Sequence, residues 1–535
     1  MKTGILSVTT SVLTLLIASC ATSVEEAGEQ VQINVETPRD EAFVDALNGA
    51  LPHLLDLVDA PGLNIAVARG GEVIFEGAYG YADVHEKRPM QVDTVFRSGS
   101  MGKVYTGVAI MQLVERGVIS LDDPINKYLP FEVKNPHGGD EVTIYHLMTH
   151  SSGLYGDGAG SVLSTPRPLE DSLRAKYSVE TQPLWGGIPT WSYKAGEGRS
   201  YSNIGIATLG LIVQRANPDG LSFSDFVELN IMQPLGMEST QYPPVQNKSE
   251  VRPEIWDRMS TGYNTTGDVW LETPIVYFEE FPAGGFVSIP RDHVKLFIAL
   301  MNGGELDGVR ILTPESVEQM LTVRGPSPHP GYPDGERGLI WFLLDWDEPG
   351  ARTFSHGGGH MFGWRTMAMA WPDHDTAIVY AFNEYSSSHV KSYYNLINEF
   401  VGALLSAELP ARTAPDLNDI ENLAWKASYL RGLIFAEGYR YGIGVPEEIE
   451  ISLARRIAAE AKFSGEPDRY SLPWDEQAFV QGVEDMNGVE GTAEAIHSFA
   501  HSEDMKVDLG EAKRIAAAMD TGVYSSLAGL LNTPE

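Results

Sequence analysis

The chain has 535 residues, of which 43% are hydrophobic and 21% are charged. This length predicts more than one domain, and the composition is that of a globular protein rather than a disordered one. The 73 acidic and 38 basic residues give a formal net charge of −35, which argues against binding to nucleic acids, and the one cysteine cannot form an internal disulfide.

The first twenty residues have the features of an export signal. A lysine at position 2 precedes an apolar run over 5–17, which is too short to span a bilayer comfortably as a helix. The run ends in Ile-Ala-Ser-Cys at 17–20, which resembles a bacterial lipobox. The resemblance implies cleavage before Cys20, a lipid anchor on Cys20 and a place in the cell envelope, at the outer membrane facing the periplasm in a Gram-negative organism. A plain signal peptide with a chance cysteine is the alternative.

Composition divides the remaining chain. Residues 21–40 are acidic and polar and predict a tether, whereas residues 41–405 alternate helical and strand patterns. A proline-containing linker at 406–415 leads to residues 416–535, which predict a separate helical domain and a candidate surface for a protein partner. Part of it, within 438–459, resembles a Sel1-type helical repeat, with an ordinary helical bundle as the alternative.

Five segments of the middle region carry clear patterns. Residues 63–68 have the period of a half-buried strand, and a pair of glycines separates them from a returning strand at 73–75. Residues 103–116 predict a helix with apolar residues on one face and a glycine stop. Residues 376–381 predict a further strand and residues 390–405 a closing helix.

A serine and a lysine stand at the start of the predicted helix. Ser100 and Lys103 are three residues apart, which places both side chains on one helix face. The helix dipole favours negative charge on the serine oxygen, and a desolvated lysine can lose its proton and activate the serine. A serine cap beside a surface lysine would show the same spacing, and Ser388 and Lys391 repeat it, so the spacing alone does not decide.

The residues around this pair resemble the serine β-lactamase and penicillin-binding protein family, in its class C-like branch, which also contains D-peptidases and esterases. The resemblance runs from about residue 61 to residue 405, and its motifs appear in the expected order: Ser100-x-x-Lys103, then Tyr201-Ser202-Asn203, then His356-Gly357-Gly358. It implies an α/β (α+β) fold, namely an antiparallel sheet flanked by helices. A helical subdomain at about 120–260 would be inserted on one side, and an all-α C-terminal domain would follow.

The resemblance also implies roles. Ser100 is expected to be the nucleophile, and Lys103 and Tyr201 are both candidate bases for its proton. Asn203 is expected to position substrate. His356 and Gly358 are expected to contact substrate, and the backbone N–H groups of Ser100 and Gly359 to form the oxyanion hole. The expected chemistry is acyl transfer to serine followed by hydrolysis, without a metal or organic cofactor.

His356 departs from the lysine that often begins the third motif. A mostly neutral imidazole removes a permanent positive charge, which disfavours anionic β-lactams and favours esters, amides or D-amino-acid peptides, as small molecules or peptides. β-Lactamase or D,D-carboxypeptidase activity proper remains one alternative. A non-catalytic envelope lipoprotein that acts as a binding protein or scaffold remains the other.

Two rival interpretations of the third motif fail on the sequence. His356 and His360 have the spacing of a helical metal-ligand pair, but the glycines between them disfavour a helix. The His-Gly-Gly-Gly run also resembles the oxyanion segment of α/β-hydrolases, yet the required Gly-x-Ser-x-Gly pentapeptide is missing from the chain. The sequence therefore predicts a serine hydrolase of the β-lactamase type.

Overall fold

A computed structural model describes most of the middle region. The described residues are 30–32, 38–58, 60–154, 161–162, 166–178, 181–182, 188–266, 269–274, 277–325, 336–344, 352–360, 363–385, 397–398, 401–402 and 404–405. The chain divides into two compact units, 1–56 with 60–385 and 57–59 with 386–535, and the first contains the sheet and the three motifs.

Several predictions fall outside these residues. Cys20, the linker at 406–415, the helical domain at 416–535 and the Ser388–Lys391 spacing are not described, so the predictions made for them stay predictions. The predicted closing helix is helical at the few positions that are described between 397 and 405. Within the described part of the chain, no helix has both the length and the apolar character needed to cross a membrane.

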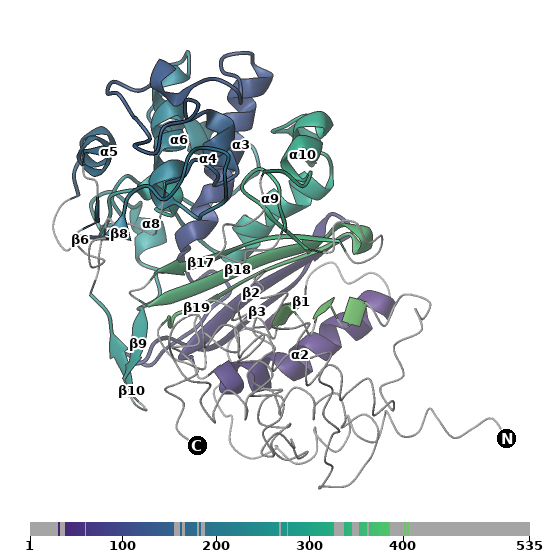
Figure 1. Cartoon of the computed structure of the whole chain (residues 1–535). Helices are drawn as coiled ribbons and strands as arrows, with labels where there is room; N and C mark the ends of the chain where they lie inside the picture. Colours follow the sequence, from purple (N-terminus) through teal and green to yellow (C-terminus); the bar gives the residue numbers. More distant parts are fainter. Residues whose placement is uncertain are drawn as a thin grey trace, which may run out of the picture. The chain divides into compact units, whose positions relative to one another are not determined.

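An antiparallel sheet forms the centre of the first unit (Figure 1). Nine strands are described, with β4 (Arg88–Pro89) pairing with β3 off the main path. The main path runs β1 (Gln30–Gln32), β3 (Glu72–Asp83), β2 (Gly62–Arg69), β19 (Thr376–Phe382), β18 (Trp364–Trp371), β17 (Thr353–His360), β16 (Phe342–Leu344) and β15 (Glu336–Arg337). This sheet confirms the predicted fold class, the predicted hairpin and the predicted late strand.

The strand β2 is buried on both faces, so the prediction of a half-buried strand was wrong. Helix α2 (Pro38–Val58) lies against one face of the sheet, where Asn48 Oδ1 accepts a hydrogen bond of 3.3 Å from the Tyr79 hydroxyl of β3, and helix α9 (Pro290–Met301) lies against the other (Figure 1). The polar residue in the pattern, Asn64, is also buried. Its burial is tolerated because its side-chain amide donates hydrogen bonds to the carbonyls of Gln91 and Val92.

The segment predicted as a tether contributes to the sheet. Residues 30–32 form the edge strand β1, which pairs with β3 so that Gln30 lies opposite Gly77. Val31, between two glutamines, lies opposite Glu76, and the backbone of β3 provides the hydrogen-bonding partners of this short strand.

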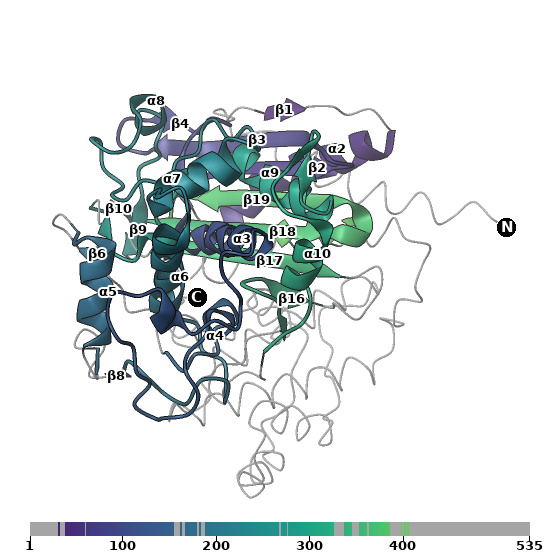
Figure 2. The ribbon, with the colours of Figure 1, turned by 90° about the horizontal axis from the view of Figure 1, so that it is seen from above.

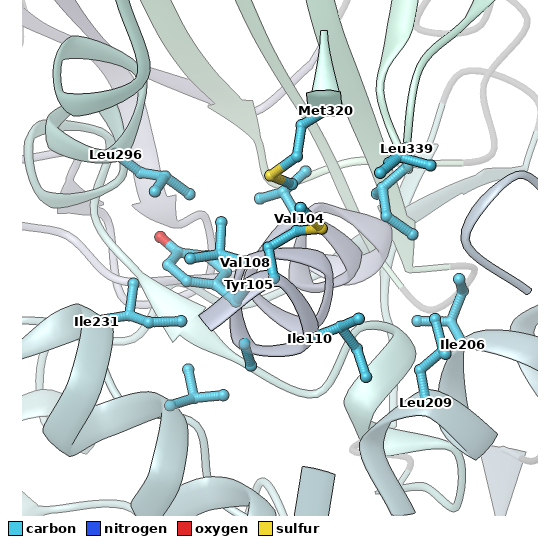
Figure 3. Close-up of a cluster of buried hydrophobic side chains, with 14 of the residues drawn as sticks. Val104, Tyr105, Val108, Ile110, Ile206, Leu209, Ile231, Leu296, Met320 and Leu339 are labelled. Carbon is cyan, nitrogen blue, oxygen red and sulfur yellow. The ribbon is translucent and has the colours of Figure 1, made fainter. Parts of the chain in front are cut away.

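Helix α3 (Gly102–Glu115) is the central helix of the layer above the sheet. It follows the short 3-10 helix η1 (Gly99–Met101) and ends before Gly117, as the sequence predicts. All residues from 102 to 113 are buried, rather than one face alone. Figure 2 shows α3 running over β17 and β18, and Figure 3 shows apolar side chains from several elements around it. The first turn of α3 is therefore fixed by packing on all sides.

The predicted inserted helical subdomain is present. It contains η2 (Ile125–Lys127), α4 (Ile144–Met148), α5 (Leu169–Tyr177), α6 (Asn203–Ala216), α7 (Phe223–Val227), the π-helix η4 (Glu228–Met232) and α8 (Pro253–Trp256). Later in the chain come η5 (Phe281–Ala283), α10 (Pro314–Met320) and η6 (Pro372–His374).

Short two-stranded pairs complete the structure. They are β5 (Phe96–Arg97) with β12 (Val287–Ser288), β6 (Ser161–Val162) with β11 (Tyr277–Phe278), β7 (Thr181–Gln182) with β8 (Ile188–Pro189), β9 (Tyr263–Thr266) with β10 (Val269–Glu272), and β13 (Glu305–Leu306) with β14 (Val309–Arg310). The pair of β5 and β12 joins the segment before α3 to the segment after η5.

A glycine sets the distance between α6 and η5. A Cβ built on Gly210 of α6 would lie 2.3 Å from Cβ of Pro282, much closer than two carbon atoms can approach. Because η5 is a single turn of 3-10 helix, a side chain at this position would displace it.

We expect Gly210→Ala to destabilise the protein by about 1–3 kcal/mol, the usual cost of overpacking a filled core. Gly49→Ala is the matched control, since Gly49 lies in α2 with nothing within 4 Å of the added Cβ, and it should stabilise by up to about 1 kcal/mol. Urea unfolding followed by tryptophan fluorescence measures both. Equal effects of the two substitutions would contradict the packing argument.

Candidate active site

Ser100 and Lys103 are in direct contact. The Nζ of Lys103 donates a hydrogen bond of 2.9 Å to Oγ of Ser100 and another of 2.7 Å to the carbonyl oxygen of Ala283. The lysine side chain is fully buried, whereas Ser100 is partly exposed. Ser100 lies in η1 and Lys103 in the first turn of α3, so the junction of the two helices brings the hydroxyl and the amine together.

The backbone before Ser100 is held from two directions. Strand β5 pairs with β12, and the N–H of Ser98 donates to the carbonyl of Phe286 at 3.2 Å. From the sheet, the hydroxyl of Thr366 in β18 donates to the carbonyl of Ser98 at 2.9 Å. The serine loop is therefore fixed between the segment after η5 and the central sheet.

Tyr201 lies beside Lys103. The Nζ of Lys103 is 4.8 Å from the ring centroid of Tyr201, in a cation–π arrangement. The hydroxyl of Ser202 caps helix α6 by accepting a hydrogen bond of 3.1 Å from the N–H of Gly205, and Asn203 is the buried first residue of that helix. The Tyr-x-Asn motif thus forms the start of a helix, as Ser100 and Lys103 do.

His356 is a buried, neutral imidazole on β17. Its Nδ1 lies 2.7 Å from the carbonyl of Gly357, and since a carbonyl only accepts, Nδ1 carries the proton and Nε2 is the acceptor. Burial, followed by the positive charge of Lys103, holds the pKa of His356 well below its usual range. The imidazole is therefore neutral at pH 7.

The glycines after His356 pack against the serine loop. A Cβ built on Gly358 would lie 2.1 Å from the carbonyl oxygen of Ser98, so packing inside the protein already requires glycine there. Gly99 has a left-handed backbone, with φ of +55°, and a Cβ built on it would lie 2.9 Å from the backbone nitrogen of Gly359. Strand β17 therefore brings the backbone of Gly359 next to the residue that precedes Ser100.

Three contributors to the site were not predicted. His150 stacks on the Tyr201 ring, with centroids 4.8 Å apart and planes at 29°. The guanidinium carbon of Arg337 on β15 lies 5.8 Å from the Tyr201 centroid and 3.6 Å from that of Phe342. The third is the carbonyl of Ala283. His150 and Arg337 lie within the range of the family resemblance but outside its three motifs, and a backbone carbonyl has no residue type that a sequence could show.

The fold and this arrangement define a serine hydrolase of the acyl-enzyme kind, because a buried lysine holds the serine hydroxyl and a tyrosine adjoins that lysine. Comparison with known protein families agrees with this assignment. Residues 50–398 match the family model described as Beta-lactamase, and the chain belongs to that family.

Two sequence relatives and one solved structure illustrate what the chain is similar to. The chain is 28% identical to Penicillin-binding protein 4* of Bacillus subtilis over 342 residues, which cover 60% of this chain and 67% of that protein. It is 37% identical to Esterase EstB of Burkholderia gladioli over 186 residues, 32% of this chain and 44% of that one, so the chain matches less than half of the esterase's length. The solved D-amino acid amidase of Ochrobactrum anthropi SV3 shares the fold, with a TM-score of 0.55, 23% identity and coverage of 69% and 99%.

A further buried histidine contacts helix α3. His293 of α9 is 2.6 Å from the Tyr105 hydroxyl through its Nδ1, and burial lowers its pKa to about 3. The folded protein therefore keeps this imidazole neutral at pH 5, whereas the unfolded chain protonates it with an ordinary pKa of about 6.5. The cost of not binding that proton increases as the pH falls below about 6.5.

We expect the free energy of unfolding of His293→Leu, measured relative to that of the wild type, to rise by about 2 kcal/mol when the pH is lowered from about 7.5 to about 5. Only the wild type loses stability through this imidazole over that range. The lost hydrogen bond to Tyr105 shifts the variant equally at both pH values and cancels from the comparison. Urea unfolding at the two pH values measures the difference. A difference that does not change with pH would show that the pKa of His293 is the same in the folded and the unfolded protein, and would contradict this expectation.

Proposed function

We propose that this chain hydrolyses uncharged esters, amides or D-amino-acid peptides through an acyl-enzyme on Ser100. The contact of 2.9 Å between Nζ of Lys103 and Oγ of Ser100 carries this proposal. The amine is buried, and it donates to both the serine hydroxyl and the carbonyl of Ala283, so it is directed at the nucleophile. The hydroxyl itself belongs to a partly exposed residue and can reach a substrate.

In the proposed reaction, Oγ attacks the substrate carbonyl carbon as the serine proton moves to a base. That base is either Tyr201, as a phenolate beside the charged amine, or Lys103 once the amine has lost its own extra proton. Both bases adjoin each other, since Nζ lies over the tyrosine ring. The resulting oxyanion would accept hydrogen bonds from the backbone N–H groups of Ser100 and Gly359. The acyl group remains on Oγ after the alcohol or amine leaves, and water then releases the acid and restores the serine.

The substrate class follows from the charge of the residues near the serine. His356 stands where the related enzymes often have lysine, and its buried imidazole is neutral. Arg337 brings a positive charge, but only 1% of it is exposed and its guanidinium stacks on Phe342. Neither group offers an accessible cation to a substrate carboxylate. The relatives named as an esterase and a D-amino acid amidase support this choice.

Labelling with a fluorophosphonate tests the nucleophile. We expect one adduct on Ser100 in the wild type, none in Ser100→Ala, and labelling at least about 100-fold slower in Lys103→Met, because the variant lacks the amine that activates the hydroxyl. Lys127→Met is the matched control, since Lys127 is exposed and pairs with Asp123. Intact mass and peptide mapping give the result. A folded wild type without an adduct would refute the hydrolase proposal and favour the binding or scaffold alternative.

A pair of substrates that differ in one carboxylate tests the substrate class. We expect the kcat/KM of the wild type for p-nitrophenyl butyrate to exceed that for p-nitrophenyl hemisuccinate by about tenfold or more, a difference of about 1.4 kcal/mol. His356→Lys should reduce the ratio of the two kcat/KM values, because the lysine adds a positive charge that attracts the carboxylate of the hemisuccinate. His356→Gln should leave this ratio unchanged.

A preference of the wild type for the hemisuccinate would contradict the proposal. It would instead favour the alternative of a carboxypeptidase or β-lactamase proper, whose substrates carry a carboxylate.

A further inference from the structure

His150 has a left-handed backbone conformation and packs against the Tyr-x-Asn motif. It follows α4, its φ is +55°, and only 2% of it is exposed. Residues other than glycine are uncommon in the left-handed region, although histidine, like asparagine and aspartate, occurs there more often than most. Such conformations persist when the surroundings fix them, and they concentrate at functional sites. The contacts of His150 show what fixes it.

Two hydrogen bonds connect His150 to the residues on either side of Tyr201. The N–H of Ser200 donates to the carbonyl of His150 at 2.8 Å, and the N–H of Ser202 donates to its Nδ1 at 3.2 Å. The imidazole then stacks on the ring of Tyr201 itself. One residue thus holds the backbone before the tyrosine, the backbone after it and the plane of its ring.

The tautomer and charge of His150 follow from the same contacts. Because Nδ1 accepts from a backbone N–H, the proton of the neutral ring is on Nε2, the opposite arrangement to that in His356. Burial, followed by the positive charges of Arg337 and Lys103, holds the pKa of His150 well below its usual range. The imidazole remains neutral and keeps its acceptor.

We propose that His150 is a positioning residue for Tyr201, which orients the phenol relative to Lys103 and Ser100 through the two backbone hydrogen bonds and the ring stack. This inference rests on the proposed function, in which Tyr201 takes part in moving the serine proton. The orientation of the tyrosine ring matters because the Nζ of Lys103, which holds the serine hydroxyl, lies only 4.8 Å from the ring centroid. Loss of the hold on Tyr201 should slow proton transfer without weakening substrate binding.

Three substitutions separate the contributions. His150→Asn keeps a short acceptor and a side chain that tolerates the left-handed backbone, but it removes the stack. His150→Phe keeps a ring and removes the acceptor from the N–H of Ser202. His150→Ala removes both. With p-nitrophenyl butyrate as the probe, we expect kcat to fall by about tenfold to about 100-fold in the alanine variant and less in the other two, with KM within about threefold of wild type.

His146→Phe is the matched control. His146 lies in α4, one turn before His150, and its Nδ1 accepts the N–H of Thr143 in a capping box, so the same replacement disturbs the helix start but not Tyr201. Unfolding temperatures of all variants are measured with the kinetics, and all assays are run well below them.

The outcomes are distinct. A graded loss of kcat in the His150 variants, with wild-type kcat in His146→Phe, supports the positioning role. Wild-type kcat in His150→Ala overturns it, and so does a loss of kcat that follows the loss of stability equally in the His146 and His150 variants. Fluorophosphonate labelling of the wild type decides the proposed function separately, because an unlabelled Ser100 refutes that function whatever the His150 variants show.

Discussion

The burial of one amine, that of Lys103, is the constraint on which the site depends. A primary amine removed from water must be hydrogen-bonded, and two of its acceptors lie at very different positions in the chain, Ser100 three residues earlier and Ala283 180 residues later. The remaining structure holds these three groups in register. Helix α3 is enclosed on all sides, η5 is pressed against α6 at Gly210, and the serine loop is tied to the sheet through Ser98.

The electrostatics of the site differ from those of the whole chain. The protein carries a formal charge of −35, yet Lys103 and Arg337 bring buried positive charges close to Tyr201. Burial, reinforced by these charges, keeps the two neighbouring imidazoles neutral, and the backbone sets their tautomers in opposite senses. His356 presents an acceptor at Nε2, while His150 uses its acceptor on the backbone of the tyrosine loop. Two residues of one type therefore act differently because of their hydrogen-bonding partners.

Local spacing and motif order in the sequence were enough to predict most of the candidate site residues. The contact between Ser100 and Lys103 spans less than one helical turn, and the resemblance supplied Tyr201, Asn203 and His356. The carbonyl of Ala283 could not be predicted, because a backbone atom has no residue type. The role of His150 depends on contacts some fifty residues along the chain, and Arg337 on the pairing of β15 with β16. The burial of strand β2 was predicted wrongly because alternation shows only which residues are polar. Asn64 is polar, yet it is buried and hydrogen-bonded in a sheet that is covered on both faces.

The strand order has a consequence for how the chain folds. β2 lies between β3 and β19, so residues 62–69 have a partner on one side from the adjacent hairpin and on the other side only from residues 376–382. During synthesis, more than three hundred residues must follow β2 before its second edge is covered. Until then one edge of an apolar strand has no partner within the sheet, and an unpaired edge of this kind favours association with other chains. Pairing between strands this far apart in the sequence also predicts slow folding.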